Sequence, residues 1–168
     1  IIDAIECDAD AAIQAKENVS NSEWSDRIHV IEGDVQDYGF NKRYDLVITN
    51  PPFFSNSLLC DSANKNLARH TLALSLTELL DAVEKSICED GYLSILLPWD
   101  EYLLWKKMMD DAGWSECSKL FVRHHANAPV KRVVALFTKK KSDDAVENIL
   151  VIKDDEQNYT AEFVALLS

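Results

Sequence analysis

Four consecutive residues, Asn50-Pro51-Pro52-Phe53, carry the clearest chemical signal in the sequence and directly follow the apolar run 44–49. Each proline fixes φ at about −65° and lacks an N–H, so the turn is rigid and cannot pair as an inner strand. It offers the Asn50 side-chain carbonyl and the Pro51 backbone carbonyl as two fixed acceptors beside the ring of Phe53. Two acceptors and an aromatic plane suit an exocyclic amine on a flat group. An ordinary strand-ending turn with Phe53 in the core is the alternative.

The hydrophobic pattern predicts the elements that position this turn. Nearly continuous apolar strands alternate with helices, which indicates an α/β fold with a mostly parallel sheet covered on both faces. The last two long strands are joined by only a short turn and must form an antiparallel hairpin. The predicted strands are residues 2–7, 27–32, 44–49, 92–97, 114–123, 130–139 and 149–152, and the main helices are 76–88, 100–112 and 160–167.

Two acidic residues also end predicted strands. Glu6 ends the first strand, and Asp34 follows the second one after Gly33. Ligands of parallel sheets bind at the carboxyl ends of the strands, so we expect Glu6, Asp34 and Asn50 to converge there. The alternatives are a solvated carboxylate for Glu6 and a plain Gly-Asp turn for Asp34, while Asp8 is best explained as a helix N-cap.

Size and charge limit the remaining possibilities. The 168 residues fit one domain (1–168), and four cysteines without metal-binding spacing predict a reduced, cytoplasmic protein with no metal. No apolar run is long enough to predict a membrane span. The net charge of −12 argues against a nucleic-acid partner, but every charged residue from Lys119 to Lys141 is basic. This stretch indicates either an RNA-binding face or a solvated hairpin.

With the strand ends aligned, the sequence resembles the class I S-adenosylmethionine-dependent methyltransferases that carry Asn-Pro-Pro-aromatic. Within that group it is similar to the bacterial tRNA(Val) adenine-N6 methyltransferase family. The segments that carry the resemblance are residues 4–8, 32–35, 44–54, 68–71, 150–152 and 159–160. The resemblance covers essentially the whole chain and implies a Rossmann-like fold, S-adenosyl-L-methionine as cofactor and tRNA as partner.

The resemblance also implies roles for individual residues. Glu6 would bind the cofactor ribose, while Asp34 and Val35 would contact its adenine. Asn50 and Pro51 would hold the target amine next to the cofactor, and Phe53 would stack the flipped base.

Further residues have two interpretations each. Arg69 and His70 would contact RNA or close the site, and an exposed charge on a loop helix is the alternative that the sequence slightly favours. Trp99, which follows a strand end, would line the rim of the pocket or pack in the core.

One departure from the family pattern is serious. The four glycines include no Gly-x-Gly, and the family's first strand with its glycine-rich loop is absent, so we expect an N-terminally incomplete chain that binds the cofactor weakly and is inactive alone. The same turn also occurs in glutamine-N5 protein, ribosomal RNA guanine-N2 and DNA adenine methyltransferases. A non-catalytic RNA-binding relic is a further alternative, and a nicotinamide-dependent dehydrogenase would leave the Asn-Pro-Pro-Phe turn unexplained.

Overall fold

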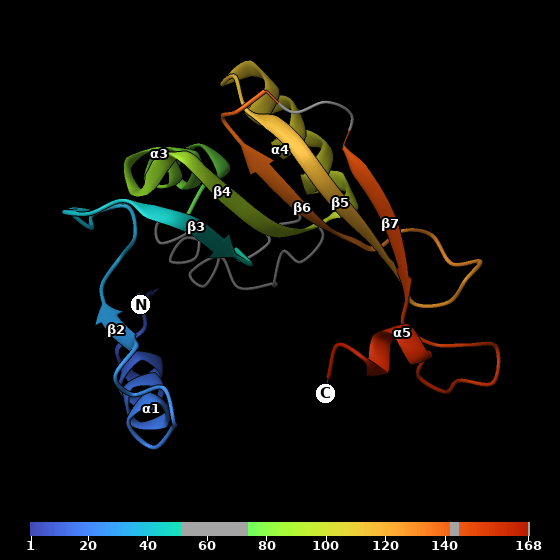
Figure 1. Cartoon of the computed structure of the whole chain (residues 1–168), viewed down its shortest axis with the longest axis horizontal. Coiled ribbons are helices and arrows are strands. Elements are labelled where there is room, and N and C mark those ends of the chain that lie inside the picture. The colour runs from blue at the N-terminus through green and yellow to red at the C-terminus, as the bar shows by residue number, and fades with distance from the viewer. Residues whose placement is uncertain (52–73, 142–144, 168) are drawn as a thin grey trace, which may run out of the picture. The chain divides into compact units, whose positions relative to one another are not determined.

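The computed structural model describes residues 1–51, 74–141 and 145–167 (Figure 1). The chain divides into two compact units. The first unit comprises Ile1–Lys42 and Ser75–Lys85, and the second comprises Arg43–Leu74 and Ser86–Ser168. Each unit has a sheet of its own among the described residues.

The first unit contains a two-stranded parallel sheet. Strand β1 (Ile2–Glu6) pairs with β2 (Ile28–Glu32) in the register Ile2 to Ile28 through Glu6 to Glu32. Helix α1 (Ala9–Ser20) packs on this pair and buries Ala12 completely. Asp8 caps the helix as expected, because its Oδ1 accepts a hydrogen bond of 2.8 Å from the Ala11 N–H.

Helix α3 (Leu76–Ser86) begins with a capping box. The Glu78 N–H donates to Ser75 Oγ, and the Ser75 N–H donates to Glu78 Oε2 at 2.8 Å. The hydrogen bonds from the Ser75 hydroxyl and backbone N–H lower the pKa of Glu78. This local chemistry fixes the first turn of the helix.

The second unit contains a sheet with the strand order β3-β4-β6-β5-β7. The parallel pairs are β3 with β4 and β5 with β7, whereas β6 is antiparallel to both of its neighbours. The predicted hairpin and the predicted α/β class are confirmed. The strands are β3 (Tyr44–Thr49), β4 (Ile87–Pro98), β5 (Ser115–Arg123), β6 (Arg132–Thr138) and β7 (Val146–Val151).

The core of the second unit lies between this sheet and helix α4 (Trp99–Asp111), which contacts β4, β5 and β6 (Figure 1). Trp105 and Met109 on the helix are completely buried. Alternate residues of β4 and β6 point to the same face of the sheet. Those on this face are almost completely buried, namely Leu93, Ile95, Leu97, Val133, Ala135 and Phe137. The other face of these strands is half-buried. The short helix α5 (Ala161–Val164) follows β7 and is shorter than predicted.

The helix predicted over residues 76–88 ends two residues earlier than expected, at Ser86. Strand β4 begins directly after α3, at Ile87, and includes Gly91. A Cβ on Gly91 would lie 2.6 Å from Ile87 Cγ1 and 3.0 Å from the Tyr44 carbonyl oxygen. The glycine therefore permits close approach of two strands where the pairing register shifts, rather than ending a helix.

Candidate active site

Glu6 lies at the carboxyl end of β1 and shapes the turn into α1. Its Oε1 accepts a hydrogen bond of 2.9 Å from the Asp8 N–H. Its backbone carbonyl accepts from the Gly33 N–H at 2.9 Å, which joins the end of β1 to the loop after β2. In the described part of the chain, Glu6 Oε2 has no hydrogen-bond partner. One carboxylate oxygen is thus structural, and the other is available to a ligand.

Asp34 follows β2 at the same edge of the first sheet. Its Oδ1 accepts a hydrogen bond of 3.0 Å from the Gln36 N–H, and its carbonyl accepts from the Asp37 N–H at 3.2 Å. These bonds form the plain turn that was the alternative interpretation of this residue. Asp34 and Val35 are both half-buried, and Oδ2 of Asp34 has no partner among the residues described. The turn holds the carboxylate in place without using up its acceptors.

Asn50 and Pro51 lie at the carboxyl end of β3 in the second unit. Asn50 is exposed, and its side-chain amide makes no hydrogen bond to any described residue. Pro51 is buried, so it anchors the backbone immediately after the amide. The predicted convergence of Asn50 with Glu6 and Asp34 stays a prediction, because these acids belong to the first unit. Phe53, Arg69 and His70 lie outside the described residues.

Trp99 directly follows strand β4, and β4 lies next to β3 in the sheet. Its ring stacks on Tyr102 with centroids 5.6 Å apart and lies 5.9 Å from the ring of Phe121. About a third of the residue (36%) is exposed. Most of the Trp99 side chain therefore packs against other residues, and only its outer part lies at the end of the sheet.

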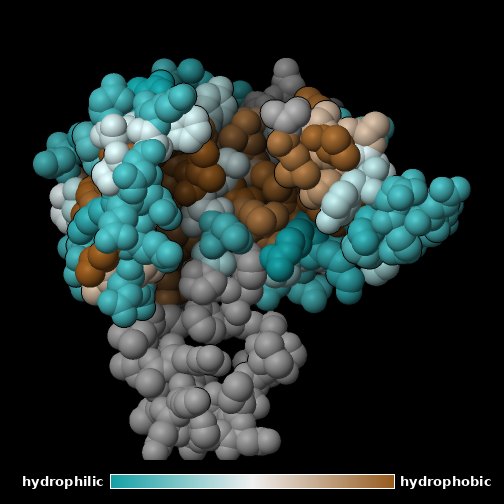
Figure 2. All heavy atoms as spheres, turned by 90° about the horizontal axis from the view of Figure 1, so that it is seen from below, coloured by the Kyte–Doolittle hydropathy of each residue, from teal (hydrophilic) through white to brown (hydrophobic). Residues whose placement is uncertain are grey.

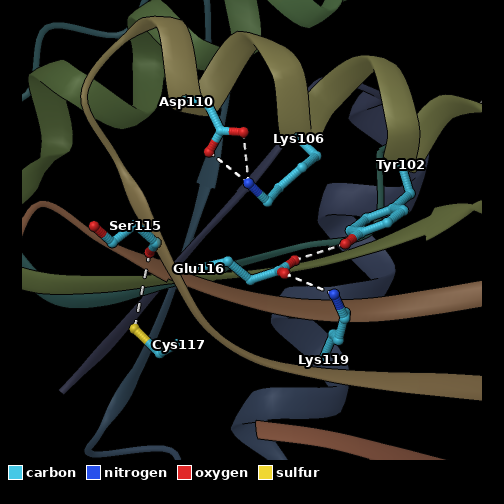
Figure 3. A network of polar contacts seen from close by, with 7 residues as sticks. All are labelled: Tyr102, Lys106, Asp110, Ser115, Glu116, Cys117 and Lys119. Atoms are coloured by element: carbon cyan, nitrogen blue, oxygen red, sulfur yellow. Dashed lines mark hydrogen bonds and ion pairs between the residues drawn. The ribbon is translucent and has the colours of Figure 1, made fainter. Parts of the chain in front are cut away.

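A buried polar network joins α4 to β5 (Figure 3), and an ion pair of Lys119 extends it to β7. Tyr102 Oη donates to Glu116 Oε1 at 2.8 Å, and Lys119 Nζ donates to Glu116 Oε2 at 3.1 Å. Lys119 also pairs with Glu147 at 2.9 Å. Only 4% of the Glu116 side chain is exposed. The sequence analysis did not identify these residues, because their types and spacing match no motif.

The protonation states in this network follow from burial and hydrogen bonding. Burial and the hydrogen bond to Glu116 raise the pKa of Tyr102 to about 12. Burial alone would lower the pKa of Lys119, but its hydrogen bonds to Glu147 and Glu116 raise it. The network therefore consists of a neutral phenol and a charged lysine around one carboxylate. Because each group is satisfied, the arrangement stabilises the fold and has no free group for catalysis.

None of the described residues form a group of three or more His, Cys, Asp or Glu side chains that could hold a metal ion. Likewise, no helix among them is long and apolar enough to cross a membrane.

Comparison with solved structures supports the fold. The structure is similar to a predicted O-methyltransferase from Agrobacterium tumefaciens, with a TM-score of 0.69 and 15% identity over 98% of this chain and 75% of that one. It is also similar to the glycopeptide N-methyltransferase MtfA, solved with S-adenosyl-L-methionine, with a TM-score of 0.54 and 11% identity over 83% of this chain and 72% of that one.

Comparison with curated protein sequences gives the family. Residues 1–80 match the family model of the methyltransferase small domain. The tRNA1(Val) (adenine(37)-N6)-methyltransferase of Trichodesmium erythraeum is 36% identical over 99% of this chain and 70% of its own length. The enzyme of the same name from Dyadobacter fermentans is 37% identical over 92% of this chain and 63% of its own length. The chain therefore belongs to the tRNA1(Val) (adenine(37)-N6)-methyltransferase family.

Proposed function

We propose that this protein transfers a methyl group from S-adenosyl-L-methionine to the exocyclic N6 amine of an adenosine in tRNA, in the cytoplasm. The observation that carries the proposal is the state of Asn50. Its amide is exposed and makes no hydrogen bond within the described part of the chain, although the adjacent Pro51 is buried. An amide on a fixed backbone with its acceptor unused is suited to bind a ligand amine.

The chemistry requires a better nucleophile than free adenine offers, because the N6 lone pair is delocalised into the ring. The Asn50 side-chain oxygen and the Pro51 carbonyl oxygen would accept the two N–H hydrogens of the amine. These bonds favour a pyramidal nitrogen whose lone pair points at the donor methyl carbon. Catalysis then depends on alignment and on preorganised acceptors more than on a strong base.

The cofactor would supply a methyl group on a positively charged sulfur. Glu6 and Asp34 fit its binding, because each has a carboxylate oxygen that no described residue occupies while the other oxygen is fixed in a turn. Glu6 would accept from the ribose hydroxyls, and Asp34 would accept from the adenine amino group. Val35 would contact the adenine ring, and Asn50 would lie between cofactor and target.

The target base would leave its stack to reach this amine site. We assign the stacking contact to Phe53, where a base on an aromatic ring is worth about 1–3 kcal/mol. Arg69 and His70 would contact the RNA near the site. These three assignments depend on the sequence and on the resemblance to the family.

The test is methyl transfer from labelled S-adenosyl-L-methionine to bulk tRNA by the full-length protein, followed by nucleoside analysis. We expect label in N6-methyladenosine. Label in N2-methylguanosine, or in protein glutamine when release factor is supplied instead, would replace the proposal with one of the other enzymes that use the same turn. RNA binding without any transfer would indicate the non-catalytic alternative.

A further inference from the structure

Basic residues lie at the end of the sheet at which strands β4, β5 and β7 end and strand β6 begins. The pairing register places Pro98 of β4 opposite Arg132 of β6, and Arg132 opposite Val122 of β5. Next along β5, Arg123 pairs with Val151 of β7. Three residues at or next to these strand ends define what we call the basic edge, namely Arg123, Lys131 and Lys153.

Backbone hydrogen bonds hold the three segments of the basic edge together. The Lys131 N–H donates to the Val122 carbonyl at 3.1 Å, and the Lys153 N–H donates to the His124 carbonyl at 3.0 Å. His125 Nδ1 lies 3.2 Å from the Asp154 carbonyl oxygen, so the loop after β7 is tied to the turn after β5. The three basic side chains therefore project from one connected scaffold.

The charges of the basic edge are not neutralised by acids. Arg123 Nη1 donates to the Ala126 carbonyl at 3.0 Å, and its buried Nε has no hydrogen-bond partner in the described structure. Lys131 and Lys153 form no ion pair with any described residue. By contrast, Lys106 and Lys107 of α4 each pair with an aspartate one helical turn later.

The acids in the loop after β7 do not cancel these charges by direct contact. The Asp154 carboxylate accepts from the Glu156 and Asn158 N–H groups, both at 2.9 Å, and is used to close the loop. Asp155 and Glu156 are exposed. Hydrophilic residues cover the right-hand end of the molecule in Figure 2, the side on which the β5–β6 turn and the β7–α5 loop project in Figure 1.

An exposed aromatic ring lies beside the basic edge. Tyr159 is 57% exposed and forms an isolated bridge with Lys153. The ring of Phe163 supports it at 5.1 Å, and Lys153 Nζ lies 5.7 Å from its centroid. A supported, exposed ring next to a cation is the arrangement on which proteins stack single-stranded bases.

We propose that the basic edge and Tyr159 bind the single-stranded RNA that flanks the target nucleotide, with phosphates on the three cations and a base on the ring. This inference rests on the proposed function. The basic edge belongs to the same sheet and the same carboxyl end as Asn50, two to four strands away. The strand spacing places it about 10–20 Å from Asn50, a span of a few nucleotides.

The test is tRNA binding by the full-length protein, measured by fluorescence anisotropy over a series of salt concentrations. Each lost phosphate contact lowers the slope of log K against log salt by about 0.7–0.9. The triple variant Arg123→Ala/Lys131→Ala/Lys153→Ala should therefore lower the slope by about two and weaken binding at least tenfold at low salt. Lys141→Ala is the matched control, because Lys141 is exposed beyond the opposite end of β6.

Two further variants separate binding from folding and phosphate from base contacts. Arg123 also donates within its own turn, so the double variant Lys131→Ala/Lys153→Ala serves as the test that leaves this bond intact, with a slope lowered by about 1.5. Tyr159→Ala should weaken binding about fivefold or more, whereas Tyr159→Phe should bind as the wild type does.

The outcomes distinguish this inference from the proposed function. A double variant with the slope and affinity of Lys141→Ala overturns the basic edge as an RNA-binding surface, whether or not the protein methylates tRNA. A wild-type protein that binds tRNA through these residues but transfers no methyl group supports the surface and contradicts the proposed enzyme activity.

Discussion

The second unit contains two sets of polar residues with opposite properties. In the network of Tyr102, Glu116 and Lys119, every group has a partner and the carboxylate is almost completely buried. At the carboxyl ends of the strands, the exposed Asn50 amide has no hydrogen-bond partner among the described residues, and Lys131 and Lys153 form no ion pair with any of them. Both regions use ordinary polar side chains on the same sheet.

The difference shows where stability and binding lie in this fold. Polar groups that satisfy one another inside the protein have no capacity left for a ligand, and removing one leaves the others unpaired. Groups at the strand ends are held by backbone bonds, while their side chains remain available. We therefore expect substitutions in the network to change stability and substitutions at the strand ends to change activity.

The largest effect is expected at Asn50. Asn50→Ala in the full-length protein should lower the rate of methyl transfer at least ~100-fold, as when one hydrogen-bond partner of a transition state is lost. Its thermal unfolding should match that of the wild type, because the amide has no partner to lose among the described residues. Steady-state methylation and thermal melting measure the two quantities, and an unchanged rate would remove Asn50 from the mechanism.

Glu116→Gln should have the opposite effect to Asn50→Ala, because it should change stability rather than activity. The substitution removes the charge that Tyr102 and Lys119 share and should lower the free energy of unfolding by about 1–3 kcal/mol. Urea denaturation provides the measurement. Glu147→Gln is the control, because this partner of Lys119 is 58% exposed and should cost less than about 1 kcal/mol. Equal losses in both variants would contradict the role assigned to burial.

Gly91→Ala tests the close approach of β3 and β4. The added methyl group would meet Ile87 Cγ1 at 2.6 Å and the Tyr44 carbonyl oxygen at 3.0 Å, so we expect a loss of about 1–2 kcal/mol in unfolding free energy. Gly39→Ala is the control, because a methyl group added at Gly39 would have no described neighbour within 4 Å. A stable Gly91→Ala variant would show that the strands separate there at little cost.

The smallest effect is expected in the alkaline titration. The pKa of Tyr102 is raised to about 12 in the folded protein, from about 10 in the unfolded chain, so folding favours the neutral phenol. Its stabilising contribution is complete below pH ~10 and is lost as the pH rises towards 12. Phenolate absorbance should show a late transition that Tyr102→Phe abolishes. A titration identical in the two proteins would contradict the buried hydrogen bond.

Much of the fold was predictable from the sequence, for reasons that particular elements illustrate. Mainly apolar runs define β3 and the centre of β4, and the short turn before β6 requires an antiparallel hairpin. The Asp8 cap was predictable because capping depends on neighbouring residues only. The start of β4 was not, since Gly91 is required by contacts with Ile87 and Tyr44 that sequence patterns do not contain.

The candidate site was predictable only in part. Glu6, Asp34 and Asn50 could be placed at strand ends, because a strand end is visible in the sequence. The free oxygens of the two acids depend on turn hydrogen bonds, which appear only in the structure. The basic stretch was visible in the sequence too, but only strand pairing shows that Arg123, Lys131 and Lys153 share one edge. The Tyr102 network depends on tertiary packing and gave no sequence signal.

The most direct test of the central claim is a double-mutant cycle between Asn50 and the target amine. It uses tRNA in which the adenosine that the protein methylates is replaced by purine riboside, which lacks the amine. We predict that loss of the amine weakens binding to the wild-type protein in the presence of S-adenosyl-L-methionine but has little further effect on Asn50→Ala. Equal weakening in both proteins would show that the asparagine does not hold the amine, and would contradict the proposed mechanism.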